Sequence, residues 1–279
     1  MPKAPVSFKL PDVFENLRKG YSNLNAQRKV LYEGNPSDTS PGNNELKYRE
    51  LENLNVCVTE LYALEPKLIH NFVDTNPFLQ TLTNDEKQQI VNHLVSNMHA
   101  LEGPYFSWRF SEYKEDDFWV MPNKTYVNMS SLQKYFNCNC GVLKGIQVDL
   151  QTVTRLFQVT FTLLTKVVNQ YIAPMNPAFD ELLFLIGLKL YDPSIQNISN
   201  NTRQRLQALR NYLIDEMAVT YKKMRLNADQ RLKSLLVVSR GIEEYTHRIR
   251  EDMLLFRCFN FTARGDKMID KVWGIPGDF

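Results

Sequence analysis

The chain has 279 residues, of which 43% are hydrophobic and 11 are glycine. This length and apolar content suffice for one large globular core, and the scarcity of glycine disfavours turn-rich β folds and glycine-rich phosphate loops. The formal net charge of +2 gives no overall field that would draw the protein to nucleic acid or to anionic membranes.

We expect an intracellular protein without a membrane span. Residues 1–11 lack the apolar stretch of a signal peptide. The most apolar segment, 153–168, is interrupted by Arg155 and Lys166 and is too short to cross a bilayer. The cysteines form neither a CxxC motif nor a zinc-ligand array, which favours reduced thiols over disulfides. They are Cys57, Cys138, Cys140 and Cys258.

Helices dominate the predicted secondary structure. Apolar residues recur at helical spacing in segments at about 13–32, 45–73, 84–101, 145–172, 178–191, 199–225 and 228–260. The prolines and turn-forming residues of 35–44 predict a flexible loop. Pro66 must either begin a helix or kink one, and Gly103-Pro104 is expected to close the helix that precedes it.

One hairpin interrupts the helices. Residues 118–121 and 125–127 have strand character and flank the turn Pro122-Asn123-Lys124. The last predicted helix would be roughly 45 Å long, enough to cross the domain and leave one face for a partner. The chain contains no internal repeat or low-complexity tract. We therefore predict a single domain over residues 1–279, with its core at about 13–273.

The stretch from 76 to 91, NPFLQTLTNDEKQQIV, is the most informative motif. Leu79 and Leu82 precede the acidic step Asp85-Glu86, and the apolar pair Ile90-Val91 follows it. This arrangement resembles the signature of nuclear hormone receptor ligand-binding domains, in which such a stretch joins two core helices.

Further segments resemble the same family, most closely its nematode-type members, and together they cover about residues 13–273. Leu101-Glu102 followed by the hairpin is similar to the family's helix-then-β-turn element. Asp180-Glu181 followed by Leu190-Tyr191-Asp192-Pro193 is similar to its glutamate-initiated helix and the turn that ends it. Arg231-Leu232 with Leu235-Leu236 is similar to the start of its long dimerisation helix.

The resemblance implies an all-α fold, a three-layer antiparallel helical sandwich with one small β-hairpin. It also implies a ligand-responsive transcription regulator of the nucleus, with the cytoplasm as a second location. In the family, a glutamate and an arginine at the positions of Glu181 and Arg231 pair inside the sandwich. A charge on the buried side of a helix needs such a partner; two separate surface charges are the alternative.

By resemblance, a ligand cavity lies between the helix before Pro66, the helix from 84 to 101, the hairpin and the last helix. Its expected lining comprises Val58, Thr59, Tyr62, His99 and Phe106, with ordinary core packing as the alternative. Fatty-acid-binding members hold the ligand carboxylate with an arginine at the position of Phe106, and Arg109, three residues away, is a candidate ligand-binding residue that could substitute for it. We therefore expect a neutral lipophilic ligand, with His99 as its polar anchor.

Members of the family bind leucine-rich coregulator helices in a groove, and the residues of this chain that correspond to that groove depart from the family pattern. The family's lysine corresponds to Asp74 here, and the glutamate of the terminal helix corresponds to Lys271. The terminal segment keeps the apolar spacing and comprises Met268, Ile269, Asp270, Lys271, Val272 and Trp273. The resemblance therefore implies that the clamp is reversed in sign or lost, with Asp270 as a one-step substitute.

The resemblance also implies homo- or heterodimerisation through the last helix, with Leu235, Ile242 and Ile249 as the expected face. No zinc module for DNA binding is present, so no direct nucleic-acid contact is expected. The absence of HExxH, GxSxG, Walker and Rossmann motifs leaves no expected catalytic residue, metal or cofactor. The alternatives are a constitutive helical interaction module without ligand and an intracellular carrier of lipophilic molecules.

Overall fold

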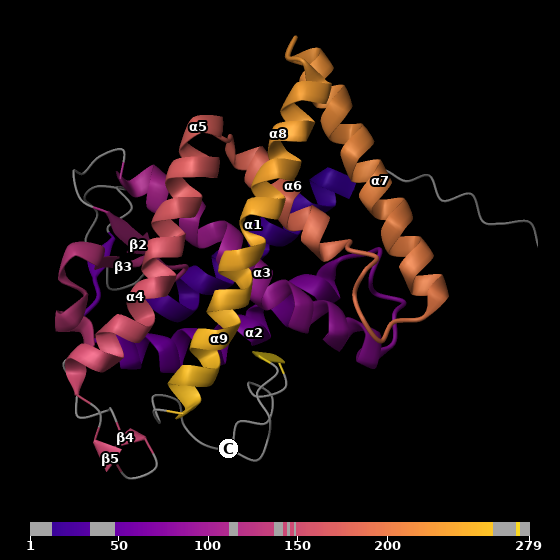
Figure 1. The fold of residues 1–279 in the computed structure, drawn as a ribbon. Coiled ribbons are helices and arrows are strands. Elements are labelled where there is room, and N and C mark those ends of the chain that lie inside the picture. The colour runs from indigo at the N-terminus through magenta and orange to yellow at the C-terminus, as the bar shows by residue number, and fades with distance from the viewer. Residues whose placement is uncertain are drawn as a thin grey trace, which may run out of the picture.

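A computed structural model describes residues 13–33, 48–111, 117–136, 142–143, 146–147, 149–258 and 272–273. The predicted loop at 35–44 lies outside these ranges. Most of the described chain is helical (Figure 1). The helices are α1 (Val13–Glu33), α2 (Leu54–Thr75), α3 (Asn84–Ser111), α4 (Leu150–Val167), α5 (Ala173–Met175), α6 (Phe179–Leu190), α7 (Asn200–Lys223), α8 (Ala228–Gly241) and α9 (Glu243–Cys258).

The remaining elements are short. The strands are β1 (Arg49–Glu50), β2 (Phe118–Val120), β3 (Thr125–Asn128), β4 (Val142–Leu143) and β5 (Ile146–Gln147). A 3-10 segment, η2 (Met129–Phe136), follows β3, and a π-helical turn, η3 (Val168–Ile172), joins α4 to α5. In the part of the chain that the structure describes, no helix is long and apolar enough to cross a membrane.

Helix α3 runs through the centre of the molecule (Figure 1). It packs against α2, which in turn packs against α1, and it also packs against α9 and α4, which contact each other. Helix α6 shares the middle layer with α3, and α7 packs against α6 and α1. This arrangement confirms the three-layer helical sandwich that the sequence predicts.

The middle layer is buried almost throughout. Every residue of α6 from Glu181 to Leu190 is buried, as expected of a helix enclosed on all sides. Helix α6 approaches its neighbours closely at Gly187, where a Cβ atom would lie 2.6 Å from a methyl group of Leu213 and 2.7 Å from one of Leu17. A larger residue at this position would force the side chains of Leu17 on α1 and Leu213 on α7 to move.

Helix α3 is longer than the sequence predicts. It continues through Gly103 and Pro104 to Ser111, instead of ending before Gly103. Both residues are buried, and α3 packs there against β2, so tertiary packing outweighs the hydrogen bond that a proline removes from a helix. Pro66 likewise lies inside α2, which continues to Thr75.

The hairpin belongs to a three-stranded sheet of order β1-β3-β2. Strands β2 and β3 pair antiparallel, with Trp119 opposite Val127, and β1 pairs parallel with β3, with Arg49 opposite Thr125. β1 falls in a segment predicted as helix, and a second hairpin of β4 and β5 lies near the predicted helix start at 145. Two-residue strands are too short for side-chain alternation to reveal them.

Candidate functional site

A charged cluster is buried where α1, α2 and α3 meet. The guanidinium of Arg28 lies between the carboxylates of Glu65 and Glu102, which have no exposed surface. Arg28 Nη2 lies 2.7 Å from Glu65 Oε2, and Nη1 lies 2.8 Å from Glu102 Oε1. The hydroxyls of Tyr21 and Tyr32 donate to Glu102 and Glu65. These contacts satisfy the buried charges and hold the three helices together.

This cluster is not among the sites predicted from the sequence, although the sequence contains a signal for it. Arg28 continues the buried stripe of Leu17, Tyr21 and Leu24 on α1 at helical spacing. A charged residue in phase with an apolar stripe indicates a buried charge, which needs a buried partner. Local spacing does not identify that partner, because both glutamates lie on other helices.

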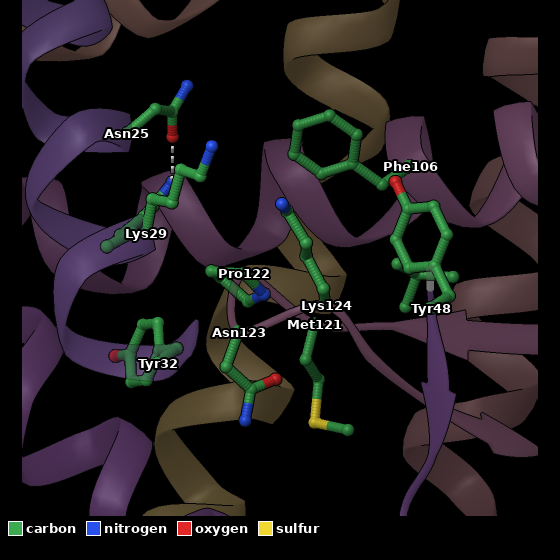
Figure 2. Close-up of a pocket in the computed structure, with 11 residues that line it drawn as sticks. Asn25, Lys29, Tyr32, Tyr48, Phe106, Met121, Pro122, Asn123 and Lys124 are labelled. Atoms are coloured by element: carbon green, nitrogen blue, oxygen red, sulfur yellow. Dashed lines mark hydrogen bonds between the residues drawn. The ribbon is translucent and has the colours of Figure 1, made fainter. Parts of the chain in front are cut away.

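A cavity of about 380 Å³ lies beside the cluster, between α1, Tyr48, α3 and the β2–β3 turn (Figure 2). Apolar and aromatic side chains line it together with amides and cations. They are Asn25, Arg28, Lys29, Tyr32, Tyr48, Phe106, Val120, Met121, Pro122, Asn123 and Lys124. Its volume lies at the lower end of the range for small-molecule sites, roughly 300–1,000 Å³.

The residues predicted to line a ligand cavity do not all face this one. Phe106 lines it, whereas His99 lies earlier on α3 and contacts the C-terminal segment. Arg109 is exposed, and its guanidinium carbon lies 5.4 Å from the ring centroid of Trp108, so it does not turn inward. The side chains of the other three, Val58, Thr59 and Tyr62, lie outside the described residues.

His99 and Trp273 bring two predicted sites together. Their rings stack with centroids 5.9 Å apart and an interplanar angle of 27°. Trp273 and the adjacent Val272 are both buried, while Met268 to Lys271 lie outside the described residues. Burial lowers the pKa of His99, so its imidazole is neutral at pH 7. A predicted ligand contact thus touches the segment predicted to bind coregulators.

Asp74, which we predict to stand in place of the family's lysine, is paired with two basic side chains. Lys87 Nζ, on α3, lies 2.7 Å from Asp74 Oδ1, and His70 Nδ1 lies 3.6 Å from Oδ2. The hydrogen bond from Lys87 lowers the pKa of Asp74. The acid at the end of α2 is therefore neutralised by a cation of the neighbouring helix.

Glu181 and Arg231 lie in contact. Arg231 Nε lies 2.6 Å from Glu181 Oε1, and Nη2 lies 2.7 Å from Oε2, which is a bidentate arrangement. The Glu181 side chain is 5% exposed and that of Arg231 is 29% exposed. Arg231 Nη1 also donates to the carbonyl of Met175, so the arginine links α8 to the last residue of α5 and to the first turn of α6.

The three residues predicted to form a dimer face are buried within the domain. Leu235 and Ile242 have no exposed surface, and Ile249 is 5% exposed, so all three belong to the core. They lie on the stripe by which α8 and α9 pack onto the domain. The exposed apolar residues of α8 are its neighbours Leu236 and Val237. Apolar spacing shows that a helix has a buried face, but not whether its own domain or a partner covers it.

The comparisons with known proteins agree with this architecture. Residues 51–259 match the model of the ligand-binding domain of nuclear hormone receptor. The chain is also similar to nuclear hormone receptor family member nhr-53 of Caenorhabditis elegans, with 21% identity over 263 residues that cover 92% of this chain and 67% of that relative. The matched region extends from the start of α2 to the end of α9 and includes His99, Glu181 and Arg231. This chain belongs to the family of nuclear hormone receptor ligand-binding domains.

Proposed function

We propose that this chain is a ligand-responsive module of a transcription regulator, which binds a small lipophilic ligand and, in response, coregulator proteins. Family membership supports a regulatory role without catalysis, and a location in the nucleus. We also propose that residues 1–279 act as one ligand-binding domain that contacts DNA only through other domains or partners.

The stacking of His99 on Trp273 is the observation that carries this proposal. In the family, the segment that contains Trp273 forms part of the coregulator groove. A ligand that enters beside His99 changes the surroundings of Trp273 and thereby the position of that segment. Binding of the ligand and binding of the coregulator would then be coupled, each changing the affinity of the other by the same factor.

Tryptophan fluorescence tests the coupling. Native mass spectrometry first identifies any lipophile that copurifies with the protein, and the stripped protein is then titrated with it. We expect the emission of the wild type to change at saturation, and the change to be largely lost in Trp273→Phe. Trp108→Phe is the matched control, because Trp108 lies further along α3. An equal response in Trp273→Phe would contradict the proposed coupling.

A constitutive interaction module is the second candidate, and the burial of Val272 and Trp273 favours it, since both side chains already pack into the core. Under this alternative, a leucine-rich coregulator peptide binds the protein with the same affinity whether or not lipophile is added. A carrier of lipophilic molecules would instead bind the lipophile and no such peptide. Measuring peptide affinity with and without lipophile separates all three functions.

A further inference from the structure

We propose that the turn between α7 and α8 is a docking site for an acidic amphipathic helix of a partner protein. The site comprises residues 222–226, which we call the basic turn, and Val219 one helical turn earlier on α7. In Figure 1 the turn between α7 and α8 is the uppermost described part of the molecule, beyond the ends of the other labelled helices. The inference goes beyond the proposed function and does not depend on it.

The basic turn lies far from the coregulator groove implied by the family. Asp74, predicted for that groove, pairs with Lys87 near the start of α3. The first turn of α7 lies beside the same part of α3, because the Thr202 hydroxyl donates to Glu86. The 24 residues of α7 span roughly 36 Å, and the basic turn lies at the other end. A partner bound there leaves the groove free.

The cations of the basic turn are not engaged. Lys222, Lys223 and Arg225 are exposed, and no side-chain hydrogen bond or ion pair joins them to another residue in the part of the chain that the structure describes. Exposed cations elsewhere do form pairs, such as Arg18 with Asp180 and Lys166 with Glu244. These charges are therefore available to an acidic partner.

The acidic residues nearest in the sequence do not neutralise this turn. Glu216 accepts hydrogen bonds from the amides of Val13 and Phe14 at the start of α1. Asp229 lies in the first turn of α8, where the positive end of the helix offsets its charge. Asp215 lies on α7 about two turns before the lysines, roughly 10 Å along the helix axis. The local potential at the turn therefore favours an acidic partner.

Exposed apolar side chains distinguish this turn from an ordinary solvated helix end. Cations at the C-terminal end of a helix interact favourably with its dipole, so the charges alone do not indicate a partner. Met224, however, is 61% exposed, the highest value among the large apolar side chains that the structure describes. Val219 and Leu226 are 48% and 47% exposed. Apolar surface rimmed by charge is typical of a protein interaction site.

The combination favours a protein helix over other acidic partners. An amphipathic helix places apolar and acidic side chains side by side at intervals of three or four residues, which matches both parts of the site. A nucleic acid backbone would engage the cations but leave the apolar side chains in water. Anionic membranes are bound by clusters of roughly four to eight cations, more than this turn provides.

The backbone of the turn is ordered without a partner. The Leu226 amide donates to the Tyr221 carbonyl, and the Arg225 amide donates to the Lys222 carbonyl. Arg225 has a φ of 59°, the left-handed conformation that glycine favours at the end of a helix. The Tyr221 hydroxyl in turn donates to the buried Glu181. Replacing Arg225 by glycine therefore removes a cation and suits the backbone.

Methyl NMR with two helical peptides of about 18 residues tests the proposal. One peptide has leucines along one face, flanked by glutamates, and the other has lysine in place of each glutamate. We expect the acidic peptide to shift the Met224 methyl signal in a saturable manner and to leave that of Met217, buried on α7, unchanged. The lysine peptide should bind at least about tenfold more weakly, and added salt should weaken binding of the acidic peptide.

Variants assign the contributions of charge and apolar surface. Lys223→Glu and Met224→Ser should each weaken binding of the acidic peptide about 3- to 10-fold, and Arg225→Gly about threefold. Lys67→Glu, at an exposed lysine of α2, is the matched control and should leave binding unchanged. The proposal is wrong if Met224 does not respond, if the lysine peptide binds as tightly as the acidic one, or if all three site variants behave like the control.

A second copy of this chain and an anionic membrane are the competing occupants of the basic turn. A Met224 signal that moves with protein concentration in the absence of peptide would assign the turn to a second copy. Tighter binding to vesicles of phosphatidylcholine and phosphatidylserine than to the acidic peptide, lost in Lys223→Glu, would assign it to a membrane. Either result would overturn the proposal.

Discussion

Glu181 is an acidic residue on the buried middle helix, and its hydrogen-bond donors explain why it is tolerated there. Tyr221 Oη and Arg231 Nε each lie 2.6 Å from Oε1, and the Ala178 amide donates to Oε2 at 2.8 Å. Burial alone would raise the pKa of Glu181, but these donors lower it. The carboxylate therefore stays ionised and links α6 to α7 and α8.

Arg231→Ala should destabilise the domain by about 3 kcal/mol. This is the lower end of the ~3–5 kcal/mol for removing one partner of a buried pair, because the Arg231 side chain is 29% exposed. Chemical denaturation measures the change, with Arg240→Ala, an exposed position on α8, as the control. The control should change stability by less than about 0.5 kcal/mol. Equal effects in both variants would show that the pair is unimportant.

Glu86 links the start of α3 to the start of α7 and should make stability depend on pH. It accepts hydrogen bonds from the Thr202 hydroxyl at 2.7 Å and the Ser199 amide at 3.1 Å. Burial raises its pKa, but these bonds prevail and lower it from 4.5 to about 2. Because the folded pKa is the lower one, this stabilisation is complete above pH 4.5 and is lost as the pH falls toward 2.

Glu86→Gln should therefore reduce the drop in melting temperature between about pH 4.5 and pH 2. Scanning calorimetry across this range measures it, and Asp85→Asn, which changes the exposed neighbouring acid, is the control. If both variants keep the pH dependence of the wild type, the hydrogen bonds of Glu86 do not contribute to acid sensitivity.

In α8 and α9, the burial of each residue shows which face of the helix packs onto the domain and which face is exposed. The buried side chains follow one stripe across both helices, from Leu235 through Ile242 to Met253. The Ile242 amide donates to the Val238 carbonyl, so helical hydrogen bonding continues across the division between α8 and α9. The opposite face of α8 exposes Leu236 and Val237. If α8 supplies a self-association surface, these two residues form its apolar part.

Leu236→Glu should weaken self-association at least about tenfold, since a charge at the apolar centre of an interface is poorly tolerated. Sedimentation velocity at about tens of micromolar protein measures it. Val159→Glu, which changes an equally exposed apolar residue on α4, should leave association unchanged. A wild type that stays monomeric under these conditions would exclude homodimerisation through α8.

For the molecule as a whole, the exposed position of Arg109 bears on the chemistry of the ligand. Since this side chain lies over Trp108 and not in the interior, a ligand carboxylate beside His99 would lose its hydration without gaining an arginine partner. Trp273 fluorescence should therefore report that the methyl ester of a long-chain fatty acid binds at least as tightly as the acid. Arg109→Ala should change either affinity less than about twofold. Binding of the acid alone, abolished by Arg109→Ala, would refute a neutral ligand.

The sequence by itself determined the helical class, the family resemblance and the extent of the most regular helices. The predicted segments 13–32, 178–191 and 199–225 correspond closely to α1, α6 and α7. Each repeats its helical spacing over several turns or carries a capping residue, such as Ser199 at the start of α7. Such signals depend on neighbours within about four residues and are therefore readable from the chain alone.

Only the tertiary structure decided what each buried face is buried against. Arg28 meets Glu65 and Glu102 from two other helices, and Lys29 and Lys124 meet beside one cavity although they are far apart in the sequence. Packing against the sheet likewise carries α3 through Pro104. These outcomes depend on contacts between distant segments. Local spacing specifies that a residue is buried, but not the partner that makes its burial favourable.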